Sequence, residues 1–218
     1  DHPEIFLVQV RAMLRANKGL GNLRMLLPMI SRVSEVDEAL KLVHRAHREL
    51  VDSGEDLVMP DVGVMIEVPS AVFQADILAQ RVDFLSVGSN DLTQYLLAVD
   101  RNNSRVAELY DALHPAVLQA ISHVVDVGHR YQKQVGVCGE LAGDPTAAVV
   151  LLGMGVDSLS MSVASLPRVK WAIRNFTAEQ ARGICQEVVA MENPQGVRER
   201  LAEVLEQAGL GGLIRAGK

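Results

Sequence analysis

Residues 84–103, FLSVGSNDLTQYLLAVDRNN, join a strand-like apolar run to a group of polar side chains. The apolar run is interrupted at Gly88. An amide and a carboxylate then follow side by side, Asn90 and Asp91, and a guanidinium comes later at Arg101. In parallel α/β folds, ligands bind beyond the carboxyl ends of the strands, so polar residues at a strand end are typical of such folds. The other strands of the chain therefore decide whether this segment is a site or a loop.

Strand-like segments alternate with segments of helical periodicity along the whole chain. The expected strands are residues 23–30, 62–69, 82–91, 134–140 and 156–162. The expected helices are residues 4–17, 34–53, 70–81, 114–131, 144–155, 166–175 and 177–191, with a polar helix in the segment 194–218. Ser34 is the expected N-cap of the second helix, with Asp37 three residues on, and Pro145 is expected at the first position of its helix.

This alternation predicts βαβ units and a parallel sheet that is buried on both faces. A closed (β/α)8 barrel of the TIM type needs eight strands and about 250 residues. Five expected strands fit either an open α/β sheet or a barrel that lacks its first three units. The pattern alone does not choose between the two.

The composition excludes several classes of protein. Of the 218 residues, 49% are apolar and only 4% are aromatic, which favours an aliphatic α/β interior. A net charge of −6 argues against binding to nucleic acid or to an anionic membrane, since both need clustered Lys and Arg. Two cysteines, Cys138 and Cys185, are too few for a disulfide framework. We therefore expect a reduced, cytoplasmic setting.

Polar side chains end three of the expected strands. Glu67 and Asp91 lie about one βα unit apart, which places them on neighbouring strands. Two carboxylates suit Mg²⁺, which keeps some of its water and takes further ligands from a substrate. Arg101 suits a carboxylate or phosphate, because its planar fork binds such anions in a bidentate way. Cys138, at the end of the next strand, would be placed to give or take a proton.

Each of these residues also has a structural interpretation. A lone glutamate at a strand end is usually solvated or paired with an arginine. The sequence SND at residues 89–91 also fits an Asx-type cap of the following helix. A cysteine on an apolar strand is most often a small core residue. The agreement of several strand ends favours a site over separate structural roles.

Four blocks of the sequence carry a family likeness: VMIEVPSA (64–71), DFLSVGSNDLTQYLLAVDRNN (83–103), VCGELAGDP (137–145) and GVDSLSMSVASLPRVK (155–170). They resemble the phosphoenolpyruvate (PEP)-binding domain of enzyme I, the PEP–protein phosphotransferase of bacterial sugar and nitrogen phosphotransferase systems. The first and last segments of the chain are more similar to the nitrogen-related type. The resemblance covers essentially the whole chain.

The resemblance implies a (β/α)8 barrel with its active site at the carboxyl ends of the strands. It also implies a role for each polar residue. Glu67 and Asp91 match Mg²⁺ ligands, Asn90 matches a residue that contacts the phosphate, and Arg101 matches one that binds the substrate anion. Cys138 matches the acid that protonates the enolate to give pyruvate.

Members of this family are homodimers that pass the phosphoryl group of PEP to a histidine on a separate N-terminal domain. A phosphocarrier protein of the HPr/NPr type then accepts it. The family's first three barrel strands, its phosphate-gripping arginines and that histidine precede the position of Asp1. We therefore expect residues 1–218 to be one barrel domain, incomplete at its N-terminal side and inactive alone. Mg²⁺ and one arginine would only partly neutralise the substrate, and phosphoryl transfer depends on electrostatic positioning.

Two alternative functions remain open from the sequence. One is another barrel enzyme of the same group, similar to pyruvate phosphate dikinase or PEP synthase. The other is a non-catalytic module that dimerises or senses a ligand without turnover.

Overall fold

The computed structural model describes residues 2–215, and its strands form one parallel sheet. The strands are β1 (Arg24–Leu27), β2 (Asp61–Ile66), β3 (Phe84–Gly88), β4 (Gln134–Cys138) and β5 (Ser158–Ser160). They pair in the order β1-β2-β3-β4-β5, and every pair is parallel. Each strand thus lies beside the one that precedes it in the chain, as in the wall of a barrel. The predicted α/β fold with five parallel strands is confirmed.

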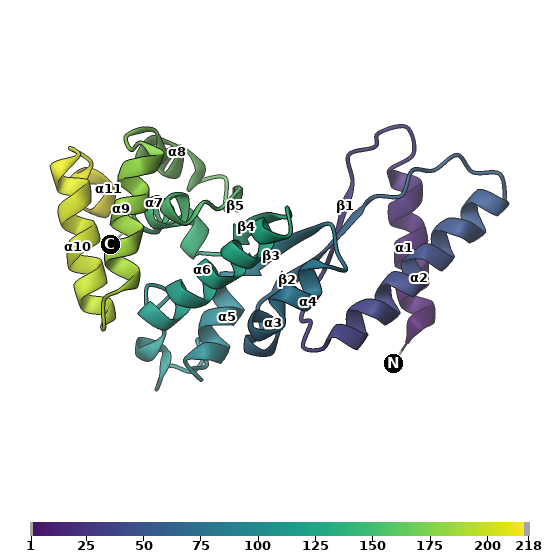
Figure 1. Cartoon of the computed structure of the whole chain (residues 1–218), viewed down its shortest axis with the longest axis horizontal. Coiled ribbons are helices and arrows are strands. Elements are labelled where there is room, and N and C mark those ends of the chain that lie inside the picture. Colours follow the sequence, from purple (N-terminus) through teal and green to yellow (C-terminus); the bar gives the residue numbers. More distant parts are fainter. Residues whose placement is uncertain (1, 216–218) are drawn as a thin grey trace.

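Helices connect these strands and extend the molecule at both ends (Figure 1). They are α1 (Pro3–Ala16), α2 (Val33–Asp52), α3 (Pro69–Phe73), α4 (Ala75–Ala79), α5 (Ser89–Leu96), α6 (Pro115–Arg130), α7 (Pro145–Met154), α8 (Leu166–Arg174), α9 (Ala178–Val189), α10 (Pro194–Gln207) and α11 (Gly211–Arg215), with short 3-10 turns η1 (Ala107–Leu109) and η2 (Leu141–Gly143). The pair α1 and α2 lies at one end of the molecule, and α7 to α11 gather at the other. Among the described residues, no helix is long and apolar enough to cross a membrane.

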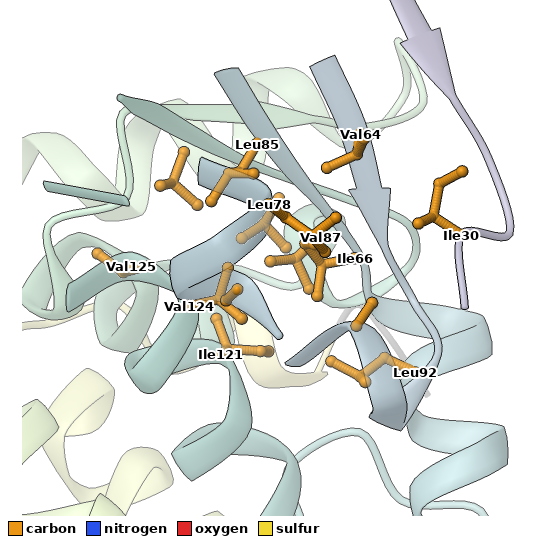
Figure 2. Packing of buried hydrophobic residues seen from close by; sticks show 14 of the residues in the cluster. Ile30, Val64, Ile66, Leu78, Leu85, Val87, Leu92, Ile121, Val124 and Val125 are labelled. Atoms are coloured by element: carbon orange, nitrogen blue, oxygen red, sulfur yellow. The ribbon is translucent and has the colours of Figure 1, made fainter. Parts of the chain in front are cut away.

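The main core lies between the sheet and the helices that cover it (Figure 2). Leu85 and Val87 of the central strand β3 are fully buried. Ile121 and Val124 of α6 pack in the same cluster, and Leu92 of α5 joins them directly after the strand ends. These contacts hold β3 and the start of α5 together as one packed unit, which carries Asn90 and Asp91.

The sequence predicted one helix over residues 70–81, but the structure has two short helices there. Helix α3 ends at Phe73, and α4 begins at Ala75. Gln74 lies between them and donates its side-chain amide to the carbonyls of Ser31, at 3.3 Å, and Ser70, at 3.1 Å. The bond to Ser31 ties the junction between α3 and α4 to the loop that follows β1.

The start of α2 also differs from the prediction. Ser34 is inside the helix and does not cap it; the N-cap is Arg32. Glu35, at the third helical position, supplies the cap with its side chain. Its carboxylate accepts from the backbone N–H groups of Ser31 at 2.8 Å and Arg32 at 3.0 Å. These two bonds hold the pKa of Glu35 below its usual value. The helix is thus capped from its third position, and Asp37 plays no part in the cap.

This cap predicts a pH-dependent contribution to stability. A carboxylate with a lowered pKa stabilises the fold above its unfolded pKa, and that contribution disappears as the pH falls from about 5 to about 3. We expect Glu35→Gln to lower the free energy of unfolding at pH 7 by about 0.5 kcal/mol, since caps of this kind are partly screened by solvent. Urea unfolding at pH 7 and pH 3 measures this. The matched control is Glu38→Gln, on the exposed side of the same helix. An equal effect of Glu35→Gln at both pH values would contradict the prediction.

Candidate functional site

The register of the sheet brings three strand ends together. Ile66 of β2 pairs with Val87 of β3, so Glu67, the next residue, comes level with Gly88. Gly88 in turn pairs with Cys138 of β4. Glu67 and Cys138 therefore flank the end of β3 from its two sides. Glu67 follows β2 and Asp91 follows the neighbouring strand β3, while Cys138 ends β4, the next strand along the sheet.

Glu67 is a buried carboxylate in a defined position. Only 4% of its surface is exposed, and its Oε1 accepts from the backbone N–H of Met29 at 2.7 Å. Met29 has a positive φ of 53°, which is uncommon outside glycine. A Cβ at Gly88 would lie 2.6 Å from Oε2 of Glu67, so only glycine leaves room for this carboxylate beside β3. The second oxygen, Oε2, therefore points toward the end of the central strand.

Asn90 and Asp91 do not extend β3 as the strand prediction for 82–91 placed them. The strand ends at Gly88, and both residues lie in the first turn of α5. The Ser89 hydroxyl causes this turn to dock on β4, because it donates to the carbonyl of Cys138 at 2.7 Å. The first turn of α5 thus lies directly over the end of β4.

The side chain of Asn90 is oriented by the next strand end. Its Oδ1 accepts from the backbone N–H of Glu140 at 3.0 Å, which assigns the amide NH₂ as the group left to donate. Gly139 makes this approach possible: its φ is +106°, and a Cβ there would come 2.5 Å from Ser89 Oγ and 2.8 Å from Asn90 Oδ1. A donor directed in this way suits an anionic ligand.

Arg101 lies beside Asp91, although a loop separates it from the helix. Its Nη2 is 3.5 Å from Asp91 Oδ1, and its backbone N–H donates to Oε1 of Gln94 at 3.2 Å. Both side chains of the ion pair are about one third exposed. A partly exposed pair of this length is weak, so either partner is available to a ligand.

Cys138 is a half-buried thiol that stays protonated at neutral pH. Burial raises its pKa, and the negative charges of Glu67 and Asp91 raise it further. Its Sγ donates to the carbonyl of Val87 at 3.4 Å. A thiol with a raised pKa is a poor nucleophile and retains a proton to give.

Two cavities open onto Asn90, Arg101 and Cys138, while Glu67 and Asp91 line neither of the two. The smaller, of about 480 Å³, is lined by Asn90, Arg101, Asn102, Ala107, Tyr110 and Glu140. The larger, of about 1020 Å³, runs from Asn90 and Cys138 past the end of β5 to α8 and α10. Tyr110 is a site residue that sequence reasoning missed, because it follows a polar, irregular loop that shows no periodicity.

The donor set fits a magnesium ion better than a transition metal. Within the part of the chain that the structure describes, no three His, Cys, Asp or Glu side chains form a group that could hold a metal. Glu67 and Asp91 are two of the carboxylates at this edge, and the charge of each raises the pKa of Cys138. Mg²⁺ is commonly bound through one or two carboxylates, with water and substrate phosphate completing its shell. Oε2 of Glu67 and the Asp91 carboxylate are the oxygens that would hold it.

The sequence matches one protein family and several bacterial enzymes. The family model described as PEP-utilising enzyme, PEP-binding domain, matches residues 1–178. The chain is 49% identical over its full length to a protein of Salmonella typhimurium named for the phosphoenolpyruvate-dependent phosphotransferase system, of which it covers 29%. It is 44% identical to the phosphoenolpyruvate-protein phosphotransferase of Haemophilus influenzae over 93% of this chain and 36% of that protein. The chain thus spans only about a third of the length of these relatives.

Solved structures of the same fold are more distant in sequence. A citrate lyase from Burkholderia xenovorans superimposes with a TM-score of 0.59 at 17% identity, over 95% of this chain and 70% of that one. An aldolase/citrate lyase family protein from Burkholderia cenocepacia gives a TM-score of 0.53 at 20% identity, over 79% of this chain and 68% of that one. At such identities the likeness shows the barrel-type fold alone.

Proposed function

The chain belongs to the family of PEP-binding domains of PEP-utilising enzymes, and from this premise we propose that it binds Mg²⁺ and PEP for phosphoryl transfer. The observation that carries the proposal is the convergence of a buried carboxylate, an oriented amide and a protonated thiol at adjacent strand ends. These groups are Glu67, Asn90 and Cys138. Each suits a different part of PEP and its reaction.

Each of the five candidate residues has its own role in this proposal: Glu67, Asn90, Asp91, Arg101 and Cys138. Glu67 and Asp91 would hold the metal ion, which would neutralise charge on the phosphate and on the developing enolate. The amide NH₂ of Asn90 donates to a phosphate oxygen, and the guanidinium of Arg101 binds the substrate anion. Both groups line the smaller cavity.

Cys138 completes the chemistry after the phosphoryl group leaves. Cleavage of the P–O bond leaves an enolate, which must gain a proton on carbon to become pyruvate. The Sγ–H bond of Cys138 breaks, the proton forms the new C–H bond, and the thiolate takes its proton back from solvent. The raised pKa supports this role, because the thiol is protonated before the reaction begins.

The finer parts of the proposal concern a longer enzyme that carries this chain. The relatives are about three times its length, which supports a phosphoryl-accepting histidine on another domain and a phosphocarrier protein of the HPr/NPr type as the final acceptor. Within the described residues β1 and β5 each pair on one side only, which supports a barrel completed by further strands and a chain that is inactive alone. A homodimer and a cytoplasmic setting belong to the same proposal, the second supported by the free thiols Cys138 and Cys185.

Calorimetric titration tests the proposal. The full-length enzyme is titrated with PEP in Mg²⁺, with PEP in EDTA, and with ATP in Mg²⁺. We expect binding of PEP that requires Mg²⁺ and no binding of ATP. Transfer of the phosphoryl group to the carrier protein is then followed with labelled PEP. Metal-independent binding of PEP would contradict the metal assignment, and dependence on a nucleotide would favour a dikinase-like enzyme instead.

A further inference from the structure

Tyr110 bonds one of the two residues that we assign to the substrate anion and lines a cavity with the other. Its hydroxyl donates to the backbone carbonyl of Asn90 at 3.4 Å. It lines the smaller cavity together with Asn90, Arg101 and Glu140. The side chain is half-buried, and it comes from the loop after η1, outside the motifs that identify the site.

Arg101 lines the same cavity as Tyr110, and its charge acts on the Tyr110 hydroxyl. Burial raises the pKa of Tyr110, while a hydrogen bond with Thr93 and the nearby Arg101 guanidinium oppose that rise. A phenol oxygen can donate one hydrogen bond and accept two. One hydroxyl can therefore hold the Asn90 carbonyl as donor and the Arg101 guanidinium as acceptor.

Arg101 has few other anchors in the described structure. Its guanidinium forms an ion pair of 3.5 Å with Asp91, and its backbone N–H bonds to Gln94. A metal ion bound by Asp91 would weaken the hold of that carboxylate on the guanidinium. The Tyr110 hydroxyl would then keep the Arg101 side chain beside Asn90.

We propose that Tyr110 is a positioning residue whose hydroxyl holds Arg101 and Asn90 together to receive the phosphate of the substrate. The proposal rests on the proposed function, because it names a further residue of the same anion site. Tyr110 acts through its neighbours, so its effect must depend on their presence. This dependence separates a positioning role from a general effect on stability.

The test removes the hydroxyl alone. We expect Tyr110→Phe in the full-length enzyme to weaken PEP binding in Mg²⁺ about tenfold, the usual effect of losing a hydrogen bond to a charged group. The unfolding midpoint and the affinity for Mg²⁺ should stay unchanged. The matched control is Tyr131→Phe, which removes a hydroxyl that bonds Gln80 at 3.2 Å at the end of α6, before β4 begins. The control should bind PEP as the wild type does.

A double-mutant cycle gives the decisive result. If Tyr110 acts through Arg101, the variant Arg101→Ala/Tyr110→Phe should bind PEP no more weakly than Arg101→Ala. Additive losses, or an unchanged affinity of Tyr110→Phe, would overturn the positioning role while leaving the proposed function intact. Failure of the wild-type enzyme to bind PEP would overturn the proposed function and this inference together.

Discussion

Replacement of Cys138 by alanine is expected to slow pyruvate formation by the full-length enzyme about a thousandfold, the range of a lost general acid. The affinity for PEP should change less than about twofold, because the acid acts on the enolate and not on the bound substrate. Pre-steady-state measurement of pyruvate release, together with titration of PEP, separates the two quantities. Cys138→Ser should be intermediate, since a hydroxyl is a weaker acid than a thiol.

The second cysteine supplies the control. Cys185 of α9 is buried in the core, and burial raises its pKa to about 11. It does not line either cavity. Cys185→Ala removes the same atom from a packing position, so it should lower stability without a change in the rate of pyruvate formation. If Cys138→Ala weakens PEP binding as much as it slows turnover, Cys138 has a packing role and is not the acid.

The combined change Glu67→Ala and Asp91→Ala is expected to abolish measurable binding of Mg²⁺ and the metal-dependent binding of PEP. We expect a loss of at least about a hundredfold, since loss of residues that only support metal ligands already costs about that much. The change leaves the N–H of Met29 without its acceptor, which by itself destabilises the fold by about 1 kcal/mol. Calorimetric titration with Mg²⁺ and with PEP measures the loss of binding.

A second pair of variants separates loss of the site from loss of the fold. Glu67→Gln with Asp91→Asn keeps an oxygen to accept from Met29 and removes only the charges, so it should fold normally and still fail to bind metal. The matched control is Glu38→Ala with Asp52→Ala, two exposed carboxylates of α2. PEP binding that survives removal of both Glu67 and Asp91 would mean that the metal ligands lie elsewhere.

The parallel sheet was predictable because its determinants are local. Buried strands of a parallel sheet are continuous apolar runs, and the segments that became β2, β3 and β4 have this pattern. Strand ends were harder to predict. The predicted strand continued to Asp91, but the chain turns into α5 after Gly88, where the Ser89 hydroxyl bonds the carbonyl of Cys138 on another strand.

The candidate site could be predicted as a set of residues but not as a geometry, and the roles of these residues stay predictions. Glu67, Asn90, Asp91 and Cys138 could be named because strand ends meet at one edge of a parallel sheet, and Arg101 because its planar guanidinium suits an anion. Tyr110 could not, since nothing in its local sequence separates it from an ordinary loop residue. Its contact with Asn90 depends on the path of the loop between α5 and α6.

The sequence by itself determined the succession of strands and helices along the chain, the chemistry at the strand ends and the family of the chain. The tertiary structure alone decided which side-chain atoms of Asn90 and Glu67 are bonded within the protein and which remain to face a ligand. Glu140 engages the oxygen of Asn90 from 50 residues away, and Met29 engages one oxygen of Glu67 from 38 residues away. Hydrogen bonds between such distant residues exist only after the strands have paired. The direction in which each group faces the ligand is therefore a property of the folded sheet.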